Sequence, residues 1–187
     1  MKCFLGPLVA VMLNGCATTE IAVPIDPFLE SIPNTIRVPG KQTVATKAFF
    51  EGGLIYTCGN QVGGKGLPPV YDWEETGSQG SLTFEGEQGY GQHEGQSYTW
   101  RLDKTTLQGA LVRTWMGNAR NDAPWNLYRT VGAAGNNVLA QVNWIQRIET
   151  QGGAIPTVAC NERFMGTRHA VKASAYFIFW KDPGVSK

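Results

Sequence analysis

The side chains of this sequence best suited to catalysis are those of His93 and Arg147. His93 stands in the glycine-rich stretch GYGQHEGQ, and an unperturbed histidine pKa of about 6.5 lets its imidazole exchange protons near neutral pH. His93 working with Arg147 would suit a hydrolase or an isomerase. The alternative is a histidine that only hydrogen-bonds its own loop. The sequence has no GxSxG motif, so a serine nucleophile has no support.

Arg147 belongs to an unusual stretch, NWIQRIETQGGAIPTVAC, which runs from residue 143 to 160. The period of two in a β-strand places Gln146 on one face of a sheet and Arg147 on the other. A buried guanidinium without a partner would cost several kcal/mol. We therefore expect a carboxylate or carbonyl groups to hold Arg147, and we expect Gln146 to be buried and hydrogen-bonded. The following Gly152 and Gly153 would allow a tight turn with positive φ. A ligand-binding role for Arg147 is the alternative.

Aromatic and acidic residues offer a second kind of chemistry, the binding of sugars or aromatic ligands. Most tryptophans of a small β domain are core residues, so we expect one or two at most on an exposed face. The candidate ligand-binding residues are Trp100, Asp103 and Gln146. A carboxylate pair could also hydrolyse a sugar, although acidic residues in loops are mostly just solvated. The stacking candidates are Trp73, Trp100, Trp115, Trp125 and Trp144, and the acidic candidates are Asp72, Glu74, Glu75 and Asp103.

The N-terminal residues resemble a bacterial lipoprotein signal peptide. Lys2 is followed by an apolar stretch, Phe4–Leu13, that is too short to span a bilayer. The run LNGC that ends at Cys16 resembles a lipobox, in which cleavage before the cysteine leaves a lipid on its thiol. Residues 1–15 would then be the signal peptide, and the lipid would hold the protein at a bilayer. Ala17 favours the outer membrane, by analogy with enterobacterial sorting. An ordinary signal peptide is the alternative.

Charge and cysteine content limit the partners and cofactors. The chain carries 16 Lys and Arg against 15 Asp and Glu, and removing Lys2 with the signal peptide would make the two sums equal. A neutral surface argues against nucleic acid, which needs a basic footprint. In an oxidising envelope Cys58 and Cys160 would pair in a disulfide, with two free buried thiols as the alternative. We therefore expect no zinc site, and no motif indicates a cofactor.

From about residue 46, short apolar or alternating runs are separated by glycine-rich turns, and convincing helical stretches are absent. We predict a single all-β domain over residues 46–187, a sandwich or barrel of about eight short antiparallel strands. Residues 16–45, which hold four prolines, would be the lipidated N-terminus and an extended tether. The predicted strands are ATKAFFEGGLIYTC (with a Gly-Gly break), PVYDWEE, GSLTFEG, SYTWRL, GALVRTWMG, WNLYRTV, VLAQVNWIQRI and KASAYFIFW.

Several stretches, in order, resemble the signature motifs of the family catalogued as domain of unknown function 3455. IQRIETQGGAIPTVAC resembles the family's IQRvnTxGGxaPxxxC. LIYTC, GQHEGQSYTW, APWNL and VKASAYFIFW resemble its qiYtC, GxHxxGPtW, xPWLL and VpYsAdYyFY. The resemblance covers roughly residues 46–180, and it implies a secreted β-rich domain of unassigned activity. The sequence departs from the family at Gln96-Ser97, where the family has Gly-Pro, and at Lys172-Ala173, where it has Pro-Tyr.

Three functions are compatible with these features. The first is a non-enzymatic envelope lipoprotein with a binding or structural role at the outer membrane, attached to the membrane through its N-terminal lipid. The second is a hydrolase or isomerase, which a cleft holding His93, Arg147 and a carboxylate would favour. The third is a module that binds a carbohydrate, an aromatic compound or another small molecule, which exposed tryptophans would favour.

Overall fold

The computed structural model describes residues 27–61, 68–85, 87–94, 97–117 and 121–184. The chain divides into two compact units, Met1–Ser31 and Ile32–Lys187. Within the first unit, the structure describes one short helix, α1 (Pro27–Glu30). The lipobox predicted at Cys16 lies outside the described residues. None of the helices among the described residues is both long enough and apolar enough to cross a membrane.

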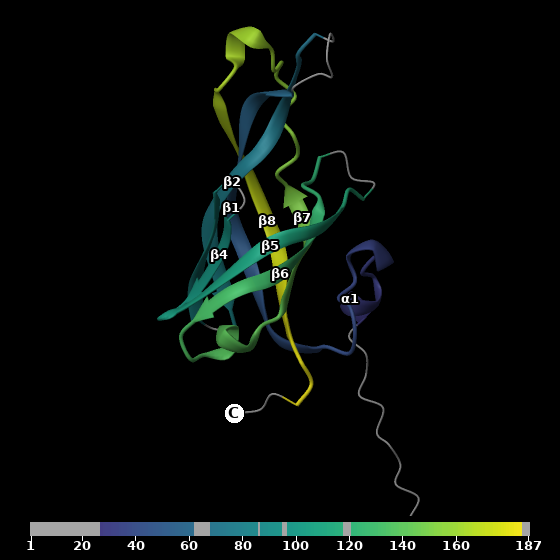
Figure 1. The fold of residues 1–187 in the computed structure, drawn as a ribbon, viewed down its shortest axis with the longest axis vertical. Helices are drawn as coiled ribbons and strands as arrows, with labels where there is room; N and C mark the ends of the chain where they lie inside the picture. The colour runs from purple at the N-terminus through teal and green to yellow at the C-terminus, as the bar shows by residue number, and fades with distance from the viewer. Residues whose placement is uncertain (1–26, 62–67, 86, 95–96, 118–120, 185–187) are drawn as a thin grey trace, which may run out of the picture. The chain divides into compact units, whose positions relative to one another are not determined.

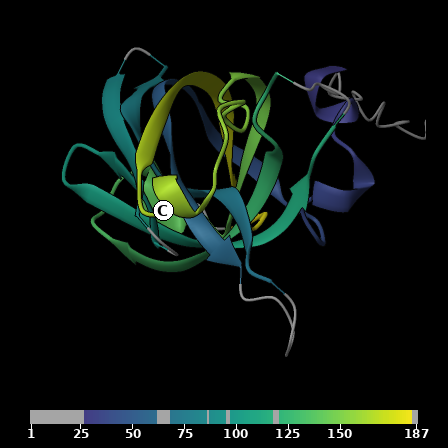
Figure 2. The ribbon, with the colours of Figure 1, turned by 90° about the horizontal axis from the view of Figure 1, so that it is seen from above.

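The unit Ile32–Lys187 is built on one antiparallel sheet that closes on itself. Each strand pairs with the next one along the chain, and the last strand pairs back with the first. Figure 2 shows this ring of strands from above. The strands are β1 (Thr43–Gln61), β2 (Val70–Phe84), β3 (Glu87–Glu94), β4 (Ser97–Leu102), β5 (Thr105–Trp115), β6 (Trp125–Ala134), β7 (Trp144–Gly152) and β8 (Arg168–Lys181), with short 3₁₀ turns η1 (Asn34–Ile36), η2 (Val138–Gln141) and η3 (Glu162–Phe164).

The ring is uneven. β6 and β7 pair only along the registered segments 126–129 and 144–147. In contrast, β1 pairs with β2 and β8 over most of its length. The β1–β2 hairpin therefore rises beyond the rest of the barrel, beside the segment that leads into β8, at the top of Figure 1.

The inside of the ring is filled mainly by aromatic and large aliphatic side chains, which gives the closed sheet its hydrophobic core. Edge-to-face contacts link several of the rings, among them Trp100 with Tyr128 and Phe177. The members of this core are Ala48, Phe50, Leu82, Phe84, Tyr98, Trp100, Leu102, Leu107, Tyr128, Leu139, Val142, Ile145, Phe177 and Phe179.

The prediction of an all-β domain with about eight antiparallel strands is confirmed, but the predicted strand boundaries are partly wrong. PVYDWEE and GSLTFEG form one continuous strand, β2. The glycine-rich stretch around His93, expected to be a loop, contains the strand β3. Residues 138–141, predicted as the start of a strand, form the turn η2. The strands β1, β2 and β8 are long, not short.

The Gly-Gly break predicted in the first strand is absent, because β1 continues through Gly52 and Gly53. Gly52 lies opposite Gly80 of β2, and the ring of Phe50 lies over both glycines. A Cβ atom on either residue would overlap this ring and the facing backbone. These glycines therefore make room for a core aromatic ring within continuous strands.

The segment before β1 also contributes to the compact unit. Ile32 and Ile36 are buried, and η1 packs against β5 and β6. Residues 32–45, assigned from sequence to a tether, thus include two side chains that lie in the interior of the domain.

Candidate functional site

Arg147 lies inside the barrel, where a carboxylate and a carbonyl group hold its guanidinium, as expected. Its side chain is only 4 % exposed and forms a two-pronged ion pair with Glu75 of β2, with Nη1 to Oε1 at 3.1 Å and Nη2 to Oε2 at 3.2 Å. Nε and Nη2 also donate to the carbonyl oxygen of Pro124, at 3.3 and 3.1 Å. Because the pairing is bidentate, it fixes both position and orientation of the guanidinium.

Asn126 and Tyr128 of β6 extend this polar network. With the Asn126 amide oriented to satisfy both of its ends, Oδ1 accepts from Arg147 Nη2 at 3.0 Å and from the Tyr128 hydroxyl at 2.9 Å. Its nitrogen then donates to the Trp125 carbonyl and to the Thr114 hydroxyl, each at 3.0 Å. Each polar end of this buried amide therefore has partners.

In this network the Arg147 guanidinium is positively charged and the tyrosine hydroxyl groups keep their protons. Burial works against the guanidinium, but the neighbouring Tyr128 and Glu75 raise the Arg147 pKa above its ordinary value. Burial raises the pKa of Tyr128 to about 12, with Arg147 opposing the rise. Burial, with Tyr128 and Glu75 adding to it, also raises the pKa of Tyr98. These tyrosines are therefore hydrogen-bond donors at neutral pH and are poorly suited to act as bases.

The cavity that the described residues form beside Arg147 is too small for an organic ligand. The cavity beside Arg147 has a volume of about 20 Å³, and Trp100, Tyr98, Tyr128 and Gln92 are among the residues that line it. This space is enough for about one water molecule, whereas sites for small molecules usually measure about 300–1,000 Å³. We therefore assign a structural role to the network around Arg147.

Gln146 is fully buried on the opposite face of the barrel wall from Arg147. Its Nε2 donates to the Ile36 carbonyl at 2.7 Å, and its Oε1 accepts from Trp180 Nε1 at 2.7 Å. The expected burial and hydrogen bonding of Gln146 are confirmed. Through its hydrogen bond to Ile36, the Gln146 side chain holds η1 against the outside of the barrel.

The other residues proposed from sequence do not gather at one place. Trp100 shares the small interior cavity with Arg147. Asp103, with φ of 49°, occupies the tight turn between β4 and β5 and is exposed. The backbone of His93 lies in β3 opposite Ser78 and Tyr98, while its side chain is outside the described part of the structure. The position of the His93 imidazole relative to Arg147 is therefore not described.

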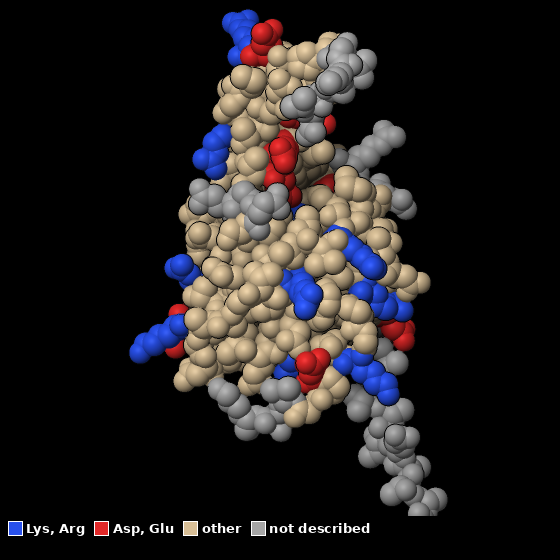
Figure 3. Space-filling view, in the orientation of Figure 1, with Lys and Arg blue, Asp and Glu red and all other residues tan. Residues whose placement is uncertain are grey.

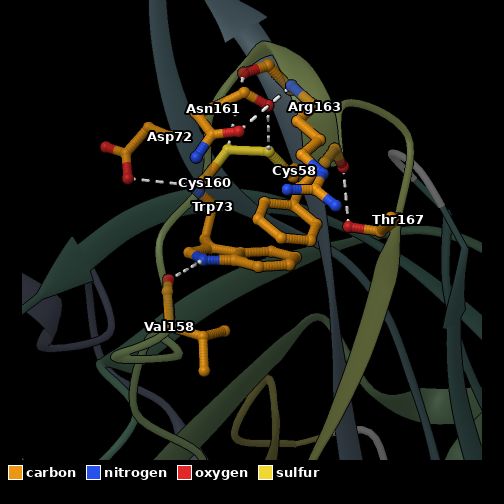
Figure 4. The surroundings of a disulfide bond; sticks show 10 residues. Cys58, Asp72, Trp73, Val158, Cys160, Asn161, Arg163 and Thr167 are labelled. Atoms are coloured by element: carbon orange, nitrogen blue, oxygen red, sulfur yellow. Dashed lines mark hydrogen bonds between the residues drawn. A yellow bond between two sulfur atoms is a disulfide. The ribbon is translucent and has the colours of Figure 1, made fainter.

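Cys58 and Cys160 form a disulfide, as predicted, with Cα atoms 5.5 Å apart and a sequence separation of 102 residues. The Cys58 amide donates to the Thr167 carbonyl at 3.0 Å, and Gly166 N donates to the Cys58 carbonyl at 2.8 Å. Trp73, opposite Cys58 in β2, donates from Nε1 to the Val158 carbonyl at 2.8 Å. Figure 4 shows the disulfide and the hydrogen bond from Trp73 to Val158. Together they fasten the segment 158–167 to the β1–β2 hairpin.

An open pocket of about 300 Å³ lies where β5 ends and β6 begins, and we call it the Trp115–Trp125 pocket. The two tryptophans are paired across the strands, with ring centroids 5.0 Å apart in an edge-to-face arrangement. Both rings are half-buried, and each leaves part of its surface to solvent. The remaining lining residues are Met116, Gly117, Asp122, Ala123, Glu149 and Thr150.

Two carboxylates line the same pocket. Asp122 is held by its Oδ1, which accepts from Gly152 N at 2.6 Å. Glu149 occupies a bulge of β7 with φ of 48°, a left-handed conformation that is uncommon for glutamate. Gly152 and Gly153, with φ of 69° and 72°, form the positive-φ segment expected after this strand. The pocket thus combines aromatic faces with two carboxylates, of which Asp122 is fixed by a hydrogen bond.

Sequence reasoning named part of this pocket. Trp115 and Trp125 were among the stacking candidates, and two tryptophans flanking a turn indicate a cross-strand pair. Asp122 and Glu149 were not among the candidates from sequence. The bulge that brings Glu149 to the tryptophans has no local sequence signal. Glu75 was considered for sugar hydrolysis, but it pairs with Arg147.

A family model described as "Protein of unknown function (DUF3455)" matches residues 63–181. The match includes β2 to β8, the Trp115–Trp125 pocket and the Arg147 network, and it begins after the LIYTC stretch. No curated protein and no solved structure gives a significant match.

Proposed function

Since the chain belongs to this family of uncharacterised proteins, we propose its function from its own structure: it is a lipid-anchored binding module of the bacterial envelope that holds a carbohydrate in the Trp115–Trp125 pocket. One observation carries this proposal. A half-buried edge-to-face tryptophan pair stands beside two carboxylates in an open pocket of about 300 Å³. The described cavity beside Arg147, by contrast, has space for about one water molecule.

The lining chemistry of the pocket suits a sugar. The apolar face of a pyranose ring packs on indole rings, while its hydroxyl groups donate to carboxylate oxygens. Asp122 supplies a carboxylate whose position is fixed by Gly152, and Glu149 supplies a second one. The planes of the two rings meet at 61°, so the rings can contact a sugar on two sides.

The surface charge is consistent with a neutral ligand. On the face drawn in Figure 3, basic and acidic side chains of the described residues are scattered, and they form no continuous basic area. Because nucleic-acid binding depends on a basic patch, this face offers no footprint for it.

Membrane attachment is the second half of the proposal, and it depends on Cys16. A diacylglyceryl group on its thiol, with the signal peptide cleaved before Cys16, would keep the binding module at a bilayer, with the outer membrane as the expected location. In a bacterial host with lipoprotein processing, wild-type protein should incorporate radiolabelled palmitate and sediment with membranes. The Cys16→Ser variant should do neither, and its circular dichroism spectrum should be unchanged. Failure of the wild type to incorporate palmitate would refute the anchoring.

Sugar binding is tested by calorimetric titration with a panel of soluble oligosaccharides, including oligomers of glucose and of N-acetylglucosamine. At least one should bind, and Trp115→Ala and Trp125→Ala should each weaken it by about tenfold, or roughly 1.4 kcal/mol. Tyr176→Ala is the matched control, because this aromatic side chain is also partly exposed but lies on β8. Absence of binding to every sugar, or equal loss in the control, would refute the carbohydrate proposal.

A further inference from the structure

A second pocket lies near the disulfide, at the end of the molecule formed by the β1–β2 hairpin and the start of β8. It has a volume of about 380 Å³, and we call it the Trp73 pocket. Trp73 is buried at the pocket, and Val158 and Phe164 contribute exposed apolar surface. Ala159, Thr167, Arg168 and His169 complete the lining.

The apolar walls of the Trp73 pocket are held in place by several independent links. The disulfide joins Cys160 to β1, and the Trp73 ring nitrogen binds the Val158 carbonyl at 2.8 Å. The Thr167 hydroxyl donates to the Phe164 carbonyl at 2.7 Å, which closes the turn η3. A segment fixed this firmly still leaves Val158 54 % exposed and Phe164 42 % exposed. Apolar side chains held open on a rigid segment are typical of a preformed ligand site.

The titratable side chains that line this pocket belong to basic residues. Arg168 and His169 are adjacent at the start of β8, and the His169 ring lies 6.1 Å from that of Trp73. Arg163 lies over the Phe164 ring at 6.0 Å. Of the nearby acids, Asp72 is turned away from the indole and accepts a hydrogen bond from the Trp73 amide, as Figure 4 shows. Glu162 lies in η3 and, like Asp72, is absent from the lining.

From this arrangement we propose that the Trp73 pocket binds a small amphipathic carboxylate, with its acyl or aryl group against Trp73, Val158 and Phe164 and its carboxylate at Arg168. The volume lies within the range of small-molecule sites. A guanidinium can bind a carboxylate through two parallel hydrogen bonds, which gives orientation as well as charge pairing. The site is separate from the Trp115–Trp125 pocket, so the two proposals can fail independently.

The test uses the full chain carrying Cys16→Ser, titrated with sodium decanoate below its micelle-forming concentration and followed by calorimetry. Saturable one-to-one binding is expected. Arg168→Gln should weaken binding by about tenfold, while Arg168→Lys should keep part of it. Val158→Ser should also weaken binding, since it removes apolar contact. Decanol and decyltrimethylammonium should bind clearly more weakly than decanoate.

Matched controls are available on the barrel wall. Arg129→Gln removes an exposed guanidinium from β6, and Val131→Ser alters a valine that is 65 % exposed, against 54 % for Val158. Both control variants should bind decanoate as the parent does, and so should Trp115→Ala. Circular dichroism and thermal midpoints establish that each variant is folded.

Three results would overturn the proposal. The first is equal binding of decanoate, decanol and the cationic probe. The second is equal loss of binding in the control variants. The third is retention by phosphatidylglycerol vesicles that depends on Val158 and Arg168 while decanoate does not bind, which would assign this surface to a lipid bilayer.

Discussion

Gln146 and Arg147 are consecutive in β7, and their side chains are buried on opposite faces of the barrel wall. Arg147 points inward to Glu75, whereas Gln146 points outward to Ile36 and Trp180. One dipeptide therefore joins three parts of the domain: the β2 strand across the lumen, the η1 turn outside it and the neighbouring strand β8. Such a pair is expected to affect stability more than binding.

Removal of the Arg147 side chain should destabilise the domain strongly. Arg147→Ala removes the guanidinium from the Glu75 carboxylate, from the Pro124 carbonyl and from the Asn126 amide oxygen, which keeps only the Tyr128 hydroxyl. Breaking a buried ion pair in this way costs about 3–5 kcal/mol. Urea unfolding should show a lower midpoint with an unchanged slope.

A double variant shows whether the loss of stability comes from the lost attraction between Arg147 and Glu75 or from a buried charge that has lost its counter-ion. Arg147→Met combined with Glu75→Leu should recover most of the loss, because buried ion pairs and apolar pairs of similar size often have similar stability. Arg129→Ala, an exposed arginine of β6, is the control and should change stability by less than about 0.5 kcal/mol. An unchanged midpoint for Arg147→Ala would contradict a structural role and would make Arg147 a ligand candidate.

Replacement of Gln146 should loosen the segment before β1. Gln146→Leu leaves the Ile36 carbonyl and the Trp180 ring nitrogen unsatisfied, at a cost of about 1–3 kcal/mol each. Limited trypsin digestion should then cleave after Arg37 faster than in the wild type. Gln151→Leu, at an exposed position of the same strand, should digest like the wild type. Equal cleavage of all three proteins would show that Gln146 does not hold this segment.

The sequence was sufficient to predict the all-β class, the disulfide and the opposite orientations of Gln146 and Arg147. The alternation of residues with a period of two predicted the strands and the orientations of Gln146 and Arg147. The number of cysteines predicted the disulfide. Strand β3 was missed for a physical reason. Gly89 and Gly91 stand where a strand normally shows apolar residues, because Phe84 and Leu82 of β2 fill the space beside them.

The partners of Arg147 and the two surface pockets could not be predicted from local patterns. Glu75 lies 72 residues before Arg147, and only closure of the ring brings them together. The bulge at Glu149 and the turn at 162–164 likewise depend on tertiary contacts. Trp115 and Trp125 were recognised as candidates, but their pairing depends on the register between β5 and β6.

Loss of the disulfide should lower thermal stability. The bond closes a loop of 102 residues, and the chain-entropy argument gives up to about 4.7 kcal/mol for a loop of this size, commonly less in practice. For a domain this large, a loss of about 3 kcal/mol corresponds to a fall in thermal midpoint of roughly 6–12 °C. Scanning calorimetry with and without reductant would measure it. The Cys58→Ala/Cys160→Ala variant should melt at the lower temperature and be insensitive to reductant. Two alkylatable thiols in peptide maps of the unreduced protein would contradict the pairing.

Tyr56 should make the domain sensitive to alkaline pH. Its buried hydroxyl donates to the Gly153 carbonyl at 2.6 Å, and burial, with a smaller contribution from Glu75, raises its pKa to about 12. Below about pH 10 the phenol is protonated in both the folded and the unfolded chain, so its contribution to stability is complete. Between about pH 10 and 12 the unfolded chain loses this proton more readily than the folded protein, so the free energy of unfolding falls as pH rises.

The Tyr56→Phe variant isolates this effect, because phenylalanine cannot ionise. At pH 8 it should be less stable than the wild type by about 1 kcal/mol, through loss of one hydrogen bond. Urea unfolding at pH 8, 10 and 11 should then show a smaller fall in stability for Tyr56→Phe than for the wild type. Tyr176→Phe, which removes a partly exposed phenol, is the control and should follow the wild type. Parallel pH profiles for wild type and Tyr56→Phe would show that the phenol of Tyr56 titrates alike in the folded and unfolded chain.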